Sequence, residues 1–269
     1  MRQALSRLTP KRMARMAQAL LLRPALWSKK HCIICGKRHR GFLPHRGGSS
    51  ASPALMIALD VVGSDVDNFE CPWCGSNDRD RHLVLFMNAM GLGEALRGAR
   101  VVHFAPERAI ARYVLGQSPD NYLPADLAPA RGVAVQMNIE TMPLADESVD
   151  FLIANHVLEH VENLSSTLGD IHRVLRPGGL AVLQTPFSSM LQQTFCDPGI
   201  MSQAARLEAY GQEDHVRLFG QDIHEIICRA GFKSLLQKHE DLLREIDPVL
   251  CGVNRLEPFF LYERTDAQR

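Results

Sequence analysis

Residues 150–161 read Asp-Phe-Leu-Ile-Ala-Asn-His-Val-Leu-Glu-His-Val, and residues 173–179 read Arg-Val-Leu-Arg-Pro-Gly-Gly. The four apolar residues after the first aspartate form a short continuous run, which is typical of a strand buried on both faces of a parallel sheet. We expect His156–Leu175 to be largely helical and to stop at the Pro-Gly-Gly sequence, because proline cannot continue a helix and glycine permits positive φ. Residues 180–185 predict the next strand, so this stretch reads as a βαβ unit.

The same alternation continues on both sides of this stretch, throughout residues 82–269. We expect further strands at residues 100–104, 121–125, 133–138, 233–238 and 258–263. Helices are expected at residues 83–96, 106–115 and 223–230. Strands that alternate with helices predict an α/β fold with a doubly wound, seven-stranded, mainly parallel sheet of the Rossmann-like kind.

Polar side chains follow three of the expected strands. Asp126, Asn138 and Asn155 stand at the carboxyl ends of the second, third and fourth strands. In open α/β sheets ligands bind at this edge. A carboxylate after the second strand can accept hydrogen bonds from both hydroxyls of a ribose.

The order of these motifs resembles the class I S-adenosylmethionine-dependent methyltransferases, particularly the methyltransferase type 11 group. The similarity covers roughly Arg100–Thr185 and includes the runs at residues 142–151, 155–161 and 173–179. Members of the family usually carry a glycine-rich loop after the first strand. Residues 103–107 instead read His-Phe-Ala-Pro-Glu, which is similar to a methyltransferase subgroup that also carries paired cysteines near its N-terminus.

The resemblance implies S-adenosylmethionine as cofactor and a set of residues that would bind it. Asp126 with Leu127 would hold the ribose, Asn138 with Ile139 would flank the adenine, and Asn155 with His156 would lie beside the methionine end. The loop after the first strand would contribute His103, Phe104, Ala105, Pro106 and Glu107. For His103, packing against the sheet is an equal alternative. Glu159 and His160 are expected in structural roles at the start of the following helix.

Four of the seven cysteines form two Cys-x-x-Cys pairs, each followed by glycine: Cys32 with Cys35 and Cys71 with Cys74. The glycines allow the tight knuckle that turns two thiolates toward one metal ion. Four thiolates satisfy tetrahedral zinc and leave no open position, so the pattern predicts a structural zinc site. Four unrelated thiols, a redox pair, or a histidine (His31 or His39) in place of one cysteine are the alternatives.

Charged residues are unevenly distributed along the chain. Residues 1–59 hold 12 of the 30 lysines and arginines and none of the 30 acidic residues. Apolar residues at helical spacing between Pro10 and Pro24 predict a helix in this basic arm. The arm suggests RNA, an acidic membrane surface or an acidic protein face as a partner, with a solvated tail as the alternative. We divide the chain into a basic arm (1–30), a zinc-binding module (31–81) and a methyltransferase domain (82–269).

A polar cluster lies between the fifth strand and the helix at 223–230. Asp214, His215 and Arg217 occupy the position where this fold often carries segments that face the substrate. His215 is the candidate general base, because the ordinary pKa of histidine lies near neutrality. Arg217 could hold a substrate carboxylate or phosphate. A polar loop with purely structural bonds is the alternative.

The function that these features predict is methyl transfer to an O, N or S nucleophile of a small molecule or natural-product intermediate. A zinc-ribbon RNA methyltransferase is the second hypothesis, and a cofactor-binding regulatory protein without catalysis is the third. No apolar run reaches the ~18–20 residues needed to span a bilayer, and we expect a cytoplasmic protein.

Overall fold

The structure, a computed structural model, describes residues 9–23, 28–129, 132 and 134–266. The chain forms two compact units. Unit 1 consists of Met1–Ala51, Ser64–His82 and Glu245–Asn254, and unit 2 of Ser52–Gly63, Leu83–Arg244 and Arg255–Arg269. Each unit therefore draws on segments that are far apart in the sequence.

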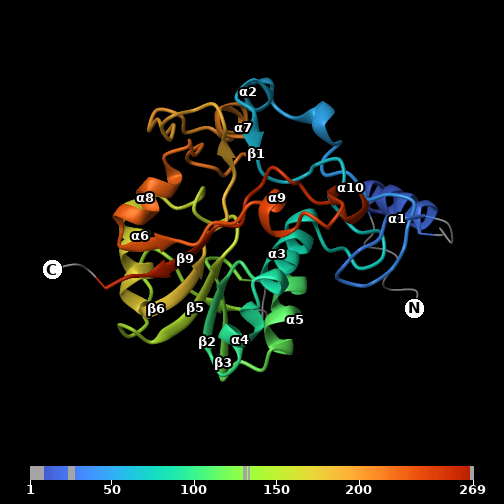
Figure 1. The fold of residues 1–269 in the computed structure, drawn as a ribbon. Coiled ribbons are helices and arrows are strands. Elements are labelled where there is room, and N and C mark those ends of the chain that lie inside the picture. Colours follow the sequence, from blue (N-terminus) through green and yellow to red (C-terminus); the bar gives the residue numbers. More distant parts are fainter. Residues whose placement is uncertain (1–8, 24–27, 130–131, 133, 267–269) are drawn as a thin grey trace. The chain divides into compact units, whose positions relative to one another are not determined.

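Unit 2 contains a seven-stranded sheet in the order β4-β3-β2-β5-β6-β9-β8 (Figure 1). Only β9 runs antiparallel to its neighbours, so the predicted mainly parallel Rossmann-like sheet is confirmed. The strands are β2 (Arg100–Phe104), β3 (Asn121–Asp126), β4 (Val135–Gln136), β5 (Val149–Ala154), β6 (Leu175–Val182), β8 (Phe232–Ser234) and β9 (Leu261–Arg264).

Helices cover both faces of this sheet. In Figure 1, α6 and α8 lie on one side of it and α4 and α5 on the other. Their bounds are α4 (Leu92–Leu96), α5 (Arg108–Gly116), α6 (Leu164–Val174) and α8 (Ile223–Arg229). Beyond the carboxyl edge a small antiparallel pair joins β1 (Val61–Val62) to β7 (Phe187–Ser188). The remaining helices of unit 2 are α2 (Ala54–Ala58), α7 (Gln203–Tyr210) and α9 (His239–Leu242).

Unit 1 is built around loops and short helices, including the predicted helix of the basic arm. Its helices are α1 (Pro10–Leu22), the 3-10 turn η2 (Ser49–Ala51) and α10 (Pro248–Cys251), while α3 (Asp78–Ala89) begins in unit 1 and continues in unit 2. The buried guanidinium of Arg81 donates to the carbonyls of Asn68, Ser76, Cys251 and Gly252 at 2.6–2.9 Å. These bonds tie the segment Glu245–Asn254 to the rest of unit 1.

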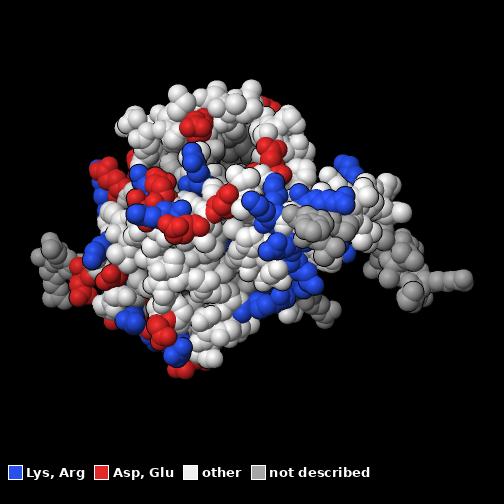
Figure 2. Space-filling view, turned by 45° about the vertical axis from the view of Figure 1, so that its right-hand side comes forward, with Lys and Arg blue, Asp and Glu red and all other residues white. Residues whose placement is uncertain are grey.

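Basic and acidic side chains are unevenly distributed over the surface. On the face seen in Figure 2, lysine and arginine side chains gather in a band right of centre with few acidic side chains among them. Elsewhere on this face the two signs are interspersed. None of the helices in the described part of the chain combines the length and apolar character needed to cross a bilayer.

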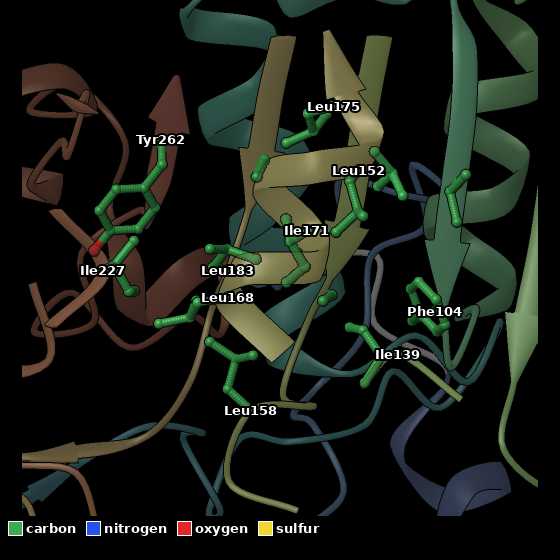
Figure 3. Packing of buried hydrophobic residues seen from close by; sticks show 14 of the residues in the cluster. Phe104, Ile139, Leu152, Leu158, Leu168, Ile171, Leu175, Leu183, Ile227 and Tyr262 are labelled. Carbon is green, nitrogen blue, oxygen red and sulfur yellow. The ribbon is translucent and has the colours of Figure 1, made fainter. Parts of the chain in front are cut away.

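A large hydrophobic core of unit 2 lies between the sheet and helices α6 and α8. Leu152 of β5, Leu168 and Ile171 of α6, and Ile227 of α8 belong to one cluster of buried side chains (Figure 3). The apolar residues of α6 recur every three to four positions, so they fall on the one face that meets the sheet.

The helix predicted from His156 begins later than expected, and this prediction was wrong. His156 has a φ of 55°, the left-handed conformation that a helix cannot contain, and its N–H donates to the Gln184 carbonyl at 2.7 Å. Helix α6 starts only after Asn163, whose side chain accepts from the Ser166 N–H at 2.9 Å as an N-cap.

Other helix and strand boundaries also differ from the predicted ones. The helix expected over 83–96 is split into α3 and α4 by Gly91, which has a φ of 67°. Strand β6 already begins at Leu175 and includes the Pro-Gly-Gly sequence. The strands predicted at 133–138, 233–238 and 258–263 are shorter or displaced, as β4, β8 and β9; residue 133 lies outside the described residues.

We predict that Leu168→Ala lowers the free energy of unfolding by about 2–5 kcal/mol, because it removes buried methyl groups and leaves a cavity. Leu115→Ala, at a leucine of α5 that is 55% exposed, should change it by less than about 0.5 kcal/mol. Urea denaturation followed by circular dichroism measures both. Equal losses in the two variants would contradict the assigned core.

Candidate functional site

The register of the parallel strands brings three of the predicted cofactor residues to one edge. Phe104 at the end of β2 pairs with Ala125 of β3 on one side and with Ala154 of β5 on the other. The residues that follow are Ala105, Asp126 and Asn155, so they lie together at the carboxyl edge. In this class of sheet the edge is where ligands bind.

A bridge through Glu107 joins the loops that follow β2 and β5. One carboxylate oxygen of Glu107 accepts from Asn155 Nδ2 at 2.6 Å, and the other lies 2.9 Å from His103 Nε2. The second ring nitrogen of His103 lies 2.9 Å from the Tyr122 hydroxyl. His103 is fully buried with partners for both nitrogens, which matches the packed alternative and gives it a positioning role through Glu107.

Two residues at this edge have backbone conformations that L-residues rarely adopt. Ala105 has a φ of 47° and His156 a φ of 55°. Each is the turn residue just beyond a parallel strand, and such strain gathers at functional sites. Ala105 is exposed, and its N–H donates to the Ala125 carbonyl at 2.8 Å. A small residue thus adopts, at the turn after β2, a backbone conformation that usually favours glycine.

Around β3 and β4 the predicted residues separate into exposed and buried ones. Asp126 is half-buried, and its Oδ1 accepts from the Ala128 N–H at 2.8 Å, while Leu127 is 66% exposed. The side chain of Asn138 is exposed and accepts from the Glu140 N–H at 2.9 Å. Ile139 points into the hydrophobic core (Figure 3), so its side chain packs beneath the carboxyl edge and is not exposed at it.

The three residues predicted to face the acceptor do not form one cluster. Asp214 is exposed, and its carboxylate lies 3.4 Å from His160 Nδ1 rather than against His215. Arg217 is buried and donates to the carbonyls of Leu158, Val161 and Glu162 at 2.5–3.0 Å. Those bonds hold the turn between β5 and α6. Arg217 thus has a positioning task in the structure, and its substrate contact stays a prediction.

His215 is buried beneath this turn. Its Nδ1 lies 2.9 Å from the Tyr210 carbonyl, and its Nε2 lies 3.9 Å from Glu159 Oε1. Burial lowers the pKa of His215 below its ordinary value, which favours the neutral imidazole. A neutral ring bonded through Nδ1–H keeps a lone pair on Nε2, the form that a general base requires.

Glu159 was expected in a structural role, but its contacts with Thr185 and with two histidines were not predicted from the sequence. It is buried, its Oε2 accepts from the Thr185 hydroxyl at 3.0 Å, and its Oε1 lies 3.2 Å from His156 Nδ1. Burial acts to raise the pKa of Glu159, but His156 and His215 outweigh it and lower the pKa to about 2. The sequence signal for these contacts was the position of Glu159 between His156 and His160.

The four paired cysteines come together in unit 1. Their sulfur atoms lie within 4.8 Å of one another, with 3.7 Å between Cys32 and Cys74 and 3.9 Å between Cys35 and Cys71. Tetrahedral zinc with bonds of about 2.3 Å places its sulfur ligands about 3.8 Å apart. The two measured separations match the spacing of sulfur ligands around tetrahedral zinc.

The two cysteine pairs have matching backbone geometry. The N–H of Cys32 donates to the Lys37 carbonyl at 3.0 Å, and the N–H of Cys71 donates to the Ser76 carbonyl at 2.9 Å. Gly36 and Gly75 each bond back to the first cysteine of their pair with φ angles of 68° and 76°. Burial, together with the charges of Cys32 and Cys74, raises the pKa of Cys35 to about 11.

Part of the chain is similar to known methyltransferases. Residues 97–183 match a family described as a methyltransferase domain. The malonyl-(acyl-carrier protein) O-methyltransferase of Pectobacterium atrosepticum is 30% identical over 104 residues, 38% of this chain and 38% of the relative. The protein of the same name from Methylococcus capsulatus is 28% identical over 120 residues, 44% of this chain and 40% of the relative. The chain thus spans less than half the length of these relatives.

Solved structures give a weaker likeness. The 1,6-didemethyltoxoflavin-N1-methyltransferase of Burkholderia thailandensis, solved with 1,6-didemethyltoxoflavin and S-adenosylhomocysteine, has a TM-score of 0.46 at 16% identity. The alignment covers 68% of this chain and 80% of that one. The match of residues 97–183 spans β2 to β6, the strands whose ends form the edge described above. Residues 97–183 are thus similar to the methyltransferase domain family over about one third of the chain.

Proposed function

We propose that this protein is an S-adenosylmethionine-dependent methyltransferase with a small-molecule acceptor. The observation that carries the proposal is the convergence of Ala105, Asp126 and Asn155 at the carboxyl edge, within the residues that match the methyltransferase family. When bound, the cofactor supplies a sulfonium-activated methyl group. Catalysis then depends chiefly on positioning, because the methyl carbon already carries a good leaving group.

The residues at the edge suit the parts of this cofactor. Asp126 offers a carboxylate oxygen to the ribose hydroxyls, and exposed Leu127 offers an apolar surface beside it. The turn at Ala105 brings backbone close to the ligand, as glycine does in related proteins. The Glu107 bridge to Asn155 fixes the two loops between which the methionine end would lie. His215 remains the candidate for the base that takes a proton from the acceptor.

RNA is the second candidate acceptor, and unit 1 carries the observation that favours it. A cavity of about 320 Å³ in unit 1 is lined by Arg12, Arg15, Arg23 and Trp73, among others. The Arg23 guanidinium lies 4.9 Å above the Trp73 ring. Basic side chains beside an exposed aromatic ring can bind a nucleic-acid strand. A binding constant that falls steeply with salt would favour RNA over a small molecule.

Removal of the Asp126 carboxylate tests the cofactor assignment. Asp126→Ala should weaken S-adenosylhomocysteine binding by about 1–3 kcal/mol, roughly 5–150-fold, because two ligand hydroxyls lose their acceptor. Isothermal titration calorimetry measures the dissociation constant. Asp120→Ala is the matched control, since Asp120 precedes the opposite end of the same strand. An unchanged dissociation constant in folded Asp126→Ala would refute the assignment.

We also propose one structural zinc ion in unit 1. The sulfur separations, the matching knuckles and the N–H of Trp73, which donates to Cys71 Sγ at 3.4 Å, support it. Four thiolates would fill the coordination of zinc and leave no position for substrate. The ion would therefore stabilise unit 1 and take no part in methyl transfer.

The parent protein should contain one zinc per chain, and Cys71→Ser should lose it because serine offers no thiolate. Inductively coupled plasma mass spectrometry on purified protein measures the content. Cys228→Ser, at an exposed cysteine of α8, is the control and should keep its zinc. Parent protein without stoichiometric zinc, or Cys71→Ser with full zinc, would show the proposal to be wrong.

A further inference from the structure

A second group of potential metal ligands lies in unit 2, and it offers a carboxylate and two imidazoles instead of thiolates. Glu159, His160 and His215 each place one ligand atom within 4.8 Å of the other two. The rings of His160 and His215 meet edge to face, with centroids 4.7 Å apart. Thr185, just beyond β6, bonds Glu159, so the group lies at the carboxyl ends of β5 and β6.

Two buried atoms of this group, Glu159 Oε1 and His215 Nε2, face one another. His215 Nε2 has no hydrogen-bond partner among the residues that the structure describes, whereas Glu159 Oε1 lies 3.2 Å from His156 Nδ1. The separation of 3.9 Å between the two facing atoms is too long for a hydrogen bond. The Tyr210 carbonyl can only accept, so the ring proton of His215 sits on Nδ1 and the lone pair of Nε2 faces the carboxylate. A metal ion between them would bind the imidazole lone pair and the carboxylate oxygen together.

The dimensions and supports of the group fit one metal ion. Two bonds of about 2.1 Å can span up to about 4.2 Å, so a single ion can contact both facing atoms. The bond from Nδ1 to a backbone carbonyl is the usual support of a metal-binding histidine. Thr185 orients the carboxylate in the same way. Arg217 fixes the turn that carries Glu159 and His160 by its bonds to three carbonyls.

We propose that Glu159, His160 and His215 bind one divalent transition-metal ion of the Mn²⁺ class. Two imidazoles and one carboxylate leave coordination positions open. The His160 side chain is one-third exposed, which gives the ion and a ligand access from solvent. Glu159 lies four residues beyond Asn155, in the turn that follows β5 at the carboxyl edge.

The role of the ion rests on the proposed methyltransferase function, although its binding does not. A divalent ion that holds an acceptor hydroxyl lowers the pKa of that hydroxyl. With its Nε2 lone pair on the ion, His215 no longer serves as the base, and the proton leaves to solvent. The oxygen lone pair forms the new O–C bond, and the S–C bond of the sulfonium breaks. The products are a methyl ether, S-adenosylhomocysteine and one proton. The site therefore selects a hydroxyl-bearing acceptor, with bidentate diols favoured because they can fill two open positions.

A metal-free interpretation of the same residues makes a different prediction. His156 Nδ1 lies 3.2 Å from Glu159 Oε1, so a protonated His156 could balance this carboxylate as an internal ion pair. In that case the group would only stabilise the turn. Changes to it would alter the unfolding free energy and would not reveal any affinity for Mn²⁺.

Electron paramagnetic resonance provides the test, because bound Mn²⁺ loses the six-line signal of the free ion. The probe is Mn²⁺ added to full-length, zinc-loaded protein without cofactor; thiolates prefer softer metals, so the cysteines do not compete. We expect one Mn²⁺ per chain, with affinity reduced at least about tenfold in both Glu159→Gln and His160→Gln. His160→Gln covers the case in which the buried Glu159 variant does not fold.

His224→Gln is the matched control. His224 is a half-buried histidine of α8 whose Nδ1 lies 2.7 Å from the Tyr262 hydroxyl, outside the group. It should bind Mn²⁺ as the parent does. Parent protein that binds no stoichiometric Mn²⁺, or folded Glu159→Gln and His160→Gln with parental affinity, would overturn the metal site. Calorimetry with S-adenosylhomocysteine on the same samples tests the methyltransferase function separately.

Discussion

Parallel pairing of β2 with β3 and β5 is the constraint on which the candidate site depends. Parallel strands place their carboxyl ends at the same edge, so the residue after each strand meets its counterparts from the others. Phe104 pairs with Ala125 and Ala154, and the following Ala105, Asp126 and Asn155 are brought together although they are up to 50 residues apart. Glu107 then locks two of these loops by bonds to His103 and Asn155.

The strands of this edge could be predicted because their signals are local. The apolar run before Asn155 and the acidic residue after the second strand need no knowledge of distant residues. The start of α6 could not be predicted in this way. The Gln184 carbonyl, from the end of a different strand, holds His156 in the left-handed conformation. Helical spacing of apolar residues continues through this turn, so the sequence pattern alone extends the helix too far.

The contacts around His215 also could not be predicted from local sequence. Asp214 is its neighbour in sequence, yet Glu159, 56 residues earlier, faces its free nitrogen. Adjacent side chains on an extended chain point apart, which favours such distant partners. In unit 1, by contrast, the cysteine spacing is itself the geometric signal, because each knuckle closes within six residues. Glu245–Asn254 joins that unit because Arg81 donates to the carbonyls of Cys251 and Gly252. No local sequence pattern predicts these bonds.

Hydrogen–deuterium exchange of the parent protein with and without S-adenosylhomocysteine tests the central claim most directly, because exchange reports local backbone opening at each loop. If the cofactor binds at this edge, saturating ligand slows exchange in the loops after β2, β3 and β5, at residues 104–108, 126–128 and 155–157. Exchange at the amino ends of the same strands should not change. Protection at the amino ends, or no protection at any loop of the carboxyl edge, would contradict the assignment of a cofactor to this site.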